Sequence, residues 1–182
     1  MTFVFTQENL ELAKKAVTKY PEGRQKSAVM ELLWLAQKQN QNWIPQAAIK
    51  YIAHFLEMPE TKVYEIATFY SMYNLKPIGK HFIQACGTTP CMLMGAEDIM
   101  QTIKEELGIK NGETTNDNLF SLLEVECLGA CSNGPMIQIN DDYYEDLTPE
   151  IIKQIIKNLK EGNPVKIGSQ KGRKSAETAE LL

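Results

Sequence analysis

The stretch 80-KHFIQACGTTPCMLMGAEDIMQTIKEELG-108 combines a strand pattern, a loop with two cysteines and a helix pattern. Residues 80–85 form a short run that predicts a buried strand ending at Cys86. Residues 94–107 place apolar side chains on one helical face and stop at Gly108, which predicts an amphipathic helix. The centre of the chain therefore predicts a strand that leads through a cysteine-containing loop into a helix.

The same kind of pattern continues toward the C-terminus. Residues 119–125 predict a second strand, residues 136–139 and 143–145 predict a hairpin, and residues 148–159 predict a closing helix with Thr148 as its N-cap. The resulting order, β-α-β-β-β-α, is typical of a small mixed sheet with helices packed on it. It resembles a thioredoxin-like domain in which a loop replaces the helix after the second strand.

The first part of the chain has a different periodicity. Apolar residues at helical spacing predict four helices before Gly79. We therefore expect an α+β fold, with an N-terminal helical bundle followed by the thioredoxin-like β-α-β-β-β-α domain. The expected divisions are a bundle at 1–78, the thioredoxin-like domain at 79–161 and an extended C-terminal arm at 162–182. Composition alone also allows this arm to be disordered.

Composition excludes some classes of function. The 182 residues are 43% hydrophobic, which is enough for a sizeable core, and carry a formal net charge of −4. A nucleic-acid-binding protein would show a basic patch, so this class is not favoured. The N-terminus lacks the pattern of a targeting signal, and no apolar run approaches the ~20 residues of a membrane span. We expect an intracellular chain with no direct membrane span.

All four cysteines lie in two short segments, 86-CGTTPC-91 and 127-CLGAC-131. Each segment follows a predicted strand, and loops beyond the carboxyl ends of strands are where sites collect in α/β sheets. If the first two strands are neighbours, the four thiols converge. In a reducing compartment such cysteines bind metal or do redox chemistry rather than form disulfides.

The spacing of the cysteines favours one of several sites. A [2Fe–2S] cluster takes two thiolates on each iron, which suits two separated pairs. Structural zinc remains open, although its sites usually contain C-x2-C pairs. A dithiol redox site would need C-x-x-C, and a Rieske centre would need histidines, whereas His54 and His81 lie outside both segments. Inert, buried cysteines are the remaining possibility.

Motifs for nucleotide cofactors are not found in the sequence. There is no G-x-G-x-x-G after a strand and no G-x-x-x-x-G-K-[ST], so the chain offers no argument for its own nicotinamide, flavin or ATP site. A cluster without a substrate site indicates an electron carrier, which requires partner proteins. Phe69, Tyr70 and Tyr73 are interpreted as helix packing rather than as an electron path.

Two segments carry a resemblance to a known family. They are 67-ATFYSMYNLKPIGKHFIQACGTTPCMLMGAEDI-99 and 125-VECLGACSNGPMIQINDDYYEDLTPE-150. Together they closely resemble the 24 kDa-type subunits of respiratory complex I, known in bacteria as the E subunits of the proton-pumping NADH–quinone oxidoreductase. The resemblance extends from about Tyr20 to Gly172.

This resemblance implies a thioredoxin-like domain with one [2Fe–2S] cluster. Matched to the family motif, Cys86, Cys91, Cys127 and Cys131 are the implied ligands. It also implies a partner subunit that binds FMN and NADH, together with the other peripheral-arm subunits of complex I. The chain would be part of an NADH:quinone oxidoreductase (translocase) without a catalytic site for NADH or quinone of its own. Its place would be the cytoplasmic side of the bacterial inner membrane.

Related protein families and departures from the family pattern leave alternative functions open. Similar domains occur in NAD-linked formate dehydrogenases and hydrogenases, where the same kind of module lies beside the same kind of flavoprotein. A structural zinc module is an alternative of another class. The chain departs from the family pattern at Gly87, where threonine is common, around Ser132, and in the ending 175-SAETAELL-182. These positions are not implied ligands, but residues around a cluster tune its properties.

Overall fold

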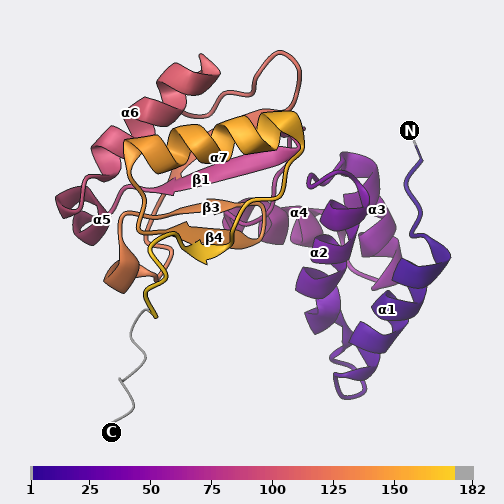
Figure 1. Ribbon diagram of the computed structural model, residues 1–182. Helices are drawn as coiled ribbons and strands as arrows, with labels where there is room; N and C mark the ends of the chain where they lie inside the picture. Colours follow the sequence, from indigo (N-terminus) through magenta and orange to yellow (C-terminus); the bar gives the residue numbers. More distant parts are fainter. Residues whose placement is uncertain (1, 175–182) are drawn as a thin grey trace, which may run out of the picture. The chain divides into compact units, whose positions relative to one another are not determined.

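The computed structural model describes residues 2–174. The chain divides into two compact units, Met1–Ile78 and Gly79–Leu182. Figure 1 shows the first as helical and the second as a sheet with helices. This content confirms the expected α+β class.

The first unit contains four α-helices and one short 3-10 helix within its described residues. They are α1 (Gln7–Thr18), η1 (Gln25–Ala28), α2 (Val29–Gln39), α3 (Gln46–Phe55) and α4 (Glu60–Phe69). Thr6 caps α1 by accepting a hydrogen bond from the Asn9 N–H, since the first N–H groups of a helix have no partner within it. Leu32, Leu33 and Ile52 are among its fully buried side chains. The four predicted helices are therefore confirmed.

The second unit is built on a five-stranded sheet. Its strands are β1 (His81–Cys86), β2 (Phe120–Val125), β3 (Ile137–Ile139), β4 (Asp142–Glu145) and β5 (Gly168–Ser169), in the spatial order β2-β1-β3-β4-β5. β1 pairs with β2 in parallel and with β3 antiparallel, β3 pairs with β4 antiparallel, and β4 pairs with β5 in parallel. The parallel pair places the ends of β1 and β2 at one edge of the sheet.

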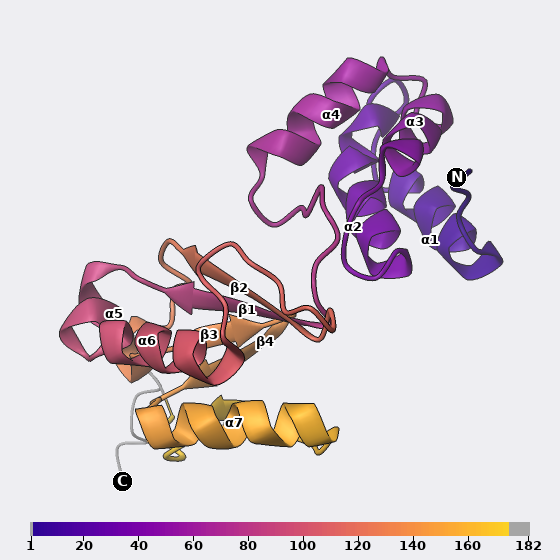
Figure 2. The same ribbon diagram turned by 90° about the horizontal axis from the view of Figure 1, so that it is seen from above.

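Two amphipathic helices cover one face of this sheet. α6 (Ala96–Leu107) and α7 (Pro149–Glu161) contact each other and lie on the same side of the strands (Figures 1 and 2). The core between them includes Ile83 of β1, Ile103 of α6 and Ile152 of α7, all at 0% exposure. Thr148 caps α7 through a hydrogen bond from the Ile151 N–H, as predicted.

Besides the short 3-10 helix η2 (Cys131–Asn133), the sequence did not predict two further elements. A short helix, α5 (Thr89–Leu93), occupies much of the first cysteine segment, and α6 begins at Ala96 rather than at Met94. Gly95, with φ +97°, separates the two helices because this left-handed conformation ends α5. Five residues are too few for a periodic pattern, and Pro90 is compatible with a first helical turn.

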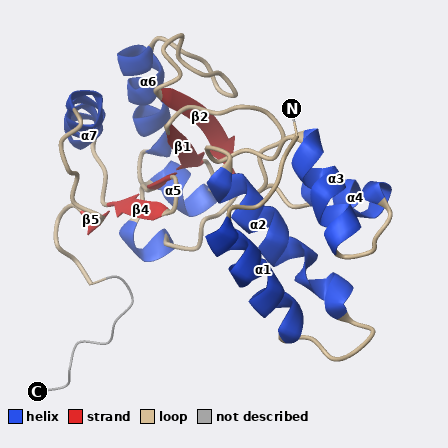
Figure 3. Ribbon diagram, turned by 90° about the vertical axis from the view of Figure 1, so that its right-hand side faces the viewer, coloured by secondary structure: helices blue, strands red, loops and turns tan. Residues whose placement is uncertain are grey.

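The second unpredicted element is β5, which lies in the segment expected to be an extended arm. Gly168 and Ser169 pair with Tyr144 and Glu145 of β4, so this part of the arm belongs to the sheet (Figure 3). This part of the segment is therefore ordered. The ending 175–182, where the sequence departs from the family pattern, lies outside the described residues.

Candidate functional site

Both cysteine segments begin at the same edge of the sheet. β1 and β2 are parallel, with His81 opposite Phe120 at one end and Cys86 opposite Val125 at the other. Cys127 follows two residues after Val125. The first two strands are thus neighbours, which is the condition under which the sequence places the segments starting at Cys86 and Cys127 side by side.

The first pair of cysteines is buried. Cys86 at the end of β1 is 3% exposed and Cys91 in α5 is 1% exposed. They pack with Ala96 and Met136, and Leu128 and Ala130 from the second cysteine segment lie against the same cluster. The Sγ atom of Cys86 is 3.3 Å from the Thr88 hydroxyl. This pair therefore lies largely in apolar surroundings, with the Thr88 hydroxyl next to Cys86.

The second pair is exposed. The Sγ atoms of Cys127 and Cys131 lie 3.6 Å apart, close enough to share one metal ion. The Gly129 N–H donates to Cys127 Sγ at 3.4 Å. Gly129 has φ +85°, a conformation that turns the short segment so that both sulfurs lie on one side. The Tyr143 hydroxyl donates to the Leu128 carbonyl at 2.7 Å and ties the segment to β4.

The thiols of the two pairs affect one another. Burial and the adjacent Cys86 thiol raise the pKa of Cys91 to about 11. The Cys127 thiol, hydrogen-bonded to Cys131, raises the pKa of Cys131, and Cys86 adds a smaller electrostatic contribution in the same direction. Four thiolates could not share this volume without positive charge to offset their repulsion.

The pKa of Cys86 is shifted in the opposite direction. Burial raises the pKa of Cys86, but hydrogen bonds from the Thr88 hydroxyl and from the N–H groups of Thr88 and Leu128 outweigh it and lower the pKa below its usual value. These donors stabilise negative charge on sulfur. The Leu128 N–H comes from the second cysteine segment, so both segments donate hydrogen bonds to the same sulfur atom.

Two separate pairs of thiols suit a binuclear group. Among residues 2–174, no three or more His, Cys, Asp or Glu side chains are grouped so as to hold one metal ion. Two pairs of thiols, one buried and one exposed, supply instead two ligands for each iron of a [2Fe–2S] cluster.

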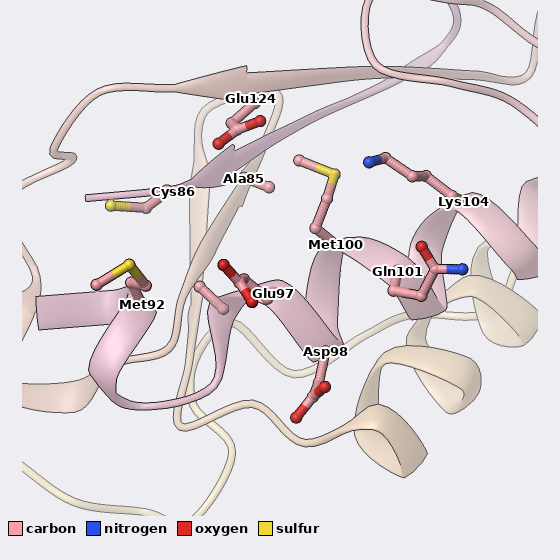
Figure 4. A pocket seen from close by; sticks show the side chains of 11 residues that line it. Ala85, Cys86, Met92, Glu97, Asp98, Met100, Gln101, Lys104 and Glu124 are labelled. Carbon is pink, nitrogen blue, oxygen red and sulfur yellow. The ribbon is translucent and has the colours of Figure 1, made fainter. Parts of the chain in front are cut away.

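A cavity of about 490 Å³ lies beside Cys86. Figure 4 shows Glu124 of β2 and Glu97 of α6 on its two sides, with Cys86 and Met92 at one end. Glu124 also lies over Gly87, where a Cβ atom would collide with its carboxylate. The absence of a side chain at Gly87, a departure from the family pattern, thus gives room to Glu124.

Other residues considered from the sequence lie in structural roles. Tyr73 is buried, its hydroxyl donates to the Met30 carbonyl at 2.8 Å, and burial raises its pKa to about 12. It packs edge-on against Tyr70, which in turn contacts Phe69. His81 is at the start of β1 with its ring 5.3 Å from that of Phe120. These contacts agree with packing for Tyr73 and His81, whereas Phe69 is 81% exposed and does not fill the core as expected.

The supporting contacts around the cysteines were missed by sequence reasoning. Tyr143, which holds Leu128, and Arg173, which donates to the Ser132 carbonyl, are 15 and 41 residues away from their acceptors. A local pattern contains no signal for such pairs. Within residues 2–174, no helix is both long and apolar enough to cross a membrane.

Comparison with known proteins gives consistent matches. Residues 13–160 match the family described as thioredoxin-like [2Fe-2S] ferredoxin. The E subunit of the NADH-quinone oxidoreductase of Rickettsia bellii is 58% identical over 158 residues, which cover 87% of this chain and 95% of the relative. The mitochondrial NADH dehydrogenase [ubiquinone] flavoprotein 2 of Dictyostelium discoideum is 50% identical over 175 residues, 96% of this chain and 71% of the relative.

A solved structure resembles the fold. In the crystal structure of an air-oxidized NAD+-reducing [NiFe]-hydrogenase, one chain matches with a TM-score of 0.64 at 18% identity. The match covers 72% of this chain and 23% of the hydrogenase chain. At this identity the likeness concerns the fold.

Proposed function

Because this chain belongs to the family of thioredoxin-like [2Fe-2S] ferredoxins, we propose that it is the electron-transfer subunit of an NADH–quinone oxidoreductase. The observation that carries this proposal is the 58% identity to the E subunit of one such bacterial enzyme over 95% of that relative. Agreement over nearly the whole relative concerns both units of the chain, not the ferredoxin domain alone.

Cys86, Cys91, Cys127 and Cys131 hold the cluster in this proposal, one pair on each iron. The close approach within each pair and the mutual effect on the thiol pKa values support this assignment. When bound, the cluster accepts and returns one electron at a time. The chain supplies the surroundings: the Thr88 hydroxyl and the Gly129 N–H lie within hydrogen-bonding distance of sulfur, where they stabilise the added negative charge.

Electrons enter and leave on the side of the exposed pair. Cys127 and Cys131 are exposed, whereas Cys86 and Cys91 are covered by protein. Met92, Leu93 and Met94 are also exposed, at 45%, 76% and 56%, and form an apolar surface next to Cys91. An apolar surface beside a redox centre suits a partner that approaches closely and excludes water.

The partner in this proposal is the subunit that binds FMN and NADH, assembled with other peripheral-arm subunits on the cytoplasmic side of the bacterial inner membrane. Hydride chemistry belongs to that partner. We further propose that 1–78 and 79–161 are separate domains and that 162–182 contributes an arm to the assembly. The two compact units support the first boundary, and β5 limits the free length of the arm.

The first experiment is a metal and spectroscopic analysis of the purified chain. We expect about two iron and about two sulfide per chain, and an EPR signal that develops on reduction with dithionite. Each of the four Cys→Ser variants is expected to lose this signal or change it. The exposed residue Met92, next to a proposed ligand, provides a control, because Met92→Leu conserves volume and leaves the sulfur ligands in place.

The outcomes separate the alternatives. A colourless protein with stoichiometric zinc would exclude electron transfer, and a native signal in all four serine variants would exclude the ligand assignment. Purification from native membranes, with identification of the associated subunits, distinguishes an NADH–quinone oxidoreductase from a formate dehydrogenase or a hydrogenase.

A further inference from the structure

Asp146 is a buried carboxylate next to the second cysteine segment. It lies between β4 and α7, with φ +58° and a side chain only 1% exposed. Its Oδ2 accepts a hydrogen bond from the Ser169 hydroxyl at 2.5 Å, and its Oδ1 accepts from Arg173 Nε at 2.9 Å and also from Arg173 Nη2. A buried carboxylate needs such partners, so Asp146 fixes the C-terminal segment that provides them.

Arg173 has a second acceptor. Its Nη2 also donates to the Ser132 carbonyl at 3.2 Å, and Ser132 directly follows Cys131. The planar guanidinium therefore bridges Asp146 and the backbone of the cysteine segment, a geometry that the single ammonium of lysine does not reproduce. The Arg173 N–H donates to Ser169 Oγ at 2.8 Å and helps to fix the direction of the side chain.

The opposite side of the same segment is tied to β4. The Asp146 N–H donates to the Asn133 carbonyl at 2.8 Å, and the Asn133 amide donates to the Glu145 carboxylate at 2.7 Å. Asn133 is buried, whereas Cys131 and Ser132 are exposed. The exposed residues have little apolar packing of their own, so their order depends on polar contacts such as the one from Arg173.

We propose that Arg173 is a positioning residue for Cys131. By joining the buried Asp146 carboxylate to the Ser132 carbonyl, it holds the exposed cysteine pair in the geometry that the metal requires. The C-terminal segment 168–173 is thus part of the metal site although it contains no ligand. This inference rests on the proposed role of Cys131, and its test includes a measurement that does not depend on a bound cluster.

That measurement is amide hydrogen exchange on the purified full chain. The Asn133 N–H is bonded to the Ala130 carbonyl at 3.2 Å and the Gly134 N–H to the Cys131 carbonyl at 3.4 Å, so both report on the segment. In Arg173→Ala we expect these amides to exchange about tenfold faster. Amides of α7, in the core of the same unit, are expected to keep their exchange rates.

The second measurement is the rate at which a chelator removes iron, together with the EPR signal of the reduced protein. Arg173→Ala is expected to lose iron about threefold faster or more and to show an altered signal. Arg173→Lys keeps the positive charge opposite the buried Asp146 carboxylate, so a change in this variant does not come from an unpaired buried charge. We expect it to recover less than half of the difference between Arg173→Ala and the wild type.

Lys166 provides the matched control. It is exposed just before the segment 168–173, and the structure records no hydrogen bond from its side chain within residues 2–174, so Lys166→Ala removes one positive charge without touching the site. We expect wild-type exchange and iron retention.

Three results would overturn the proposal. They are unchanged exchange in Arg173→Ala, an equal acceleration in α7, which would mean a general loss of stability, and full restoration by Arg173→Lys, which would mean that charge alone suffices. A wild-type chain that holds no cluster would instead count against the proposed function, and the exchange data would still decide whether Arg173 orders the segment.

Discussion

Replacing Gly79 by alanine tests the close approach of backbone at the start of the β1–β2 pair. A Cβ atom at this position would lie 2.5, 2.8 and 2.9 Å from the carbonyl carbon, nitrogen and Cα of Phe120. Ordinary contact begins at 3.4 Å, so the two segments would have to separate by about 0.9 Å. These neighbours are backbone atoms, which cannot rotate away as the end of a side chain can.

The expected loss of stability follows from this geometry. Overpacking of this kind costs about 1–3 kcal/mol, and alanine returns about 0.4–1 kcal/mol by restricting the unfolded chain. The displacement also strains the hydrogen bond from the Gly79 N–H to Ser121 Oγ, which is 2.7 Å long. We expect the free energy of unfolding of the second unit to fall by about 1–2 kcal/mol.

The assay is thermal unfolding of the full chain followed by two signals. Both tryptophans, Trp34 and Trp43, belong to the first unit, whereas far-ultraviolet circular dichroism reports on both units. In Gly79→Ala we expect the midpoint of the dichroism transition to fall by about 4–8 °C for each kcal/mol, with the fluorescence transition unchanged.

A control and two contrary outcomes complete the test. Gly112 has φ +83° and nothing within 4 Å of the place that a Cβ atom would take, and asparagine tolerates this conformation, so Gly112→Asn should stay within about 0.5 kcal/mol of the wild type. Unchanged or increased stability of Gly79→Ala would refute the steric argument. An equal fall in the fluorescence midpoint would contradict the proposal that the two units are separate domains.

Other variants test the core, the acid response and the packing of the first cysteine segment. Ile103→Ala removes a side chain with 0% exposure beneath α6 and should cost about 2–5 kcal/mol in urea unfolding. The hydrogen bond from Arg173 lowers the pKa of the Asp146 carboxyl below its usual range, so its stabilisation is present above the pKa of the unfolded carboxyl and is lost as the pH falls through the lowered pKa of the folded state. Asp146→Asn should therefore be less stable at pH 7 and show a smaller fall in stability on acidification toward pH 3, measured by urea unfolding across this range. Gly87→Ala should lose up to about 1 kcal/mol because its Cβ displaces the Glu124 carboxylate, and the additional change Glu124→Ala should remove most of this loss in a double-mutant cycle.

Local pattern was sufficient for the regular elements. The period of the apolar residues predicted α6, whose buried Ile99 and Ile103 lie on the expected face, and Thr148 was correctly predicted to cap α7. It was insufficient for α5 and β5. These elements have five and two residues, too few for a period, and β5 exists only because β4 offers hydrogen bonds to it.

For the cysteines, too, the sequence predicted some features and not others. Their positions after two strands indicated that Cys86 and Cys127 would lie together if those strands were neighbours, and the parallel pairing of β1 and β2 fulfils this condition. Sequence spacing did not predict that one pair would be buried and the other exposed. That difference depends on Met136 and Ala96, which pack against Cys86 and Cys91 from other elements.

The sequence by itself therefore determined the order of the longer helices and strands, the α+β class and the four sulfur atoms available to a metal, because each depends on residues close together in the chain. Only the tertiary structure decided what surrounds those sulfurs. Gly87 makes room for Glu124, and the carbonyl of Ser132 accepts a hydrogen bond from Arg173, 41 residues away. Such contacts arise when the sheet brings distant segments together, and their energies depend on burial and direction, which no local pattern contains.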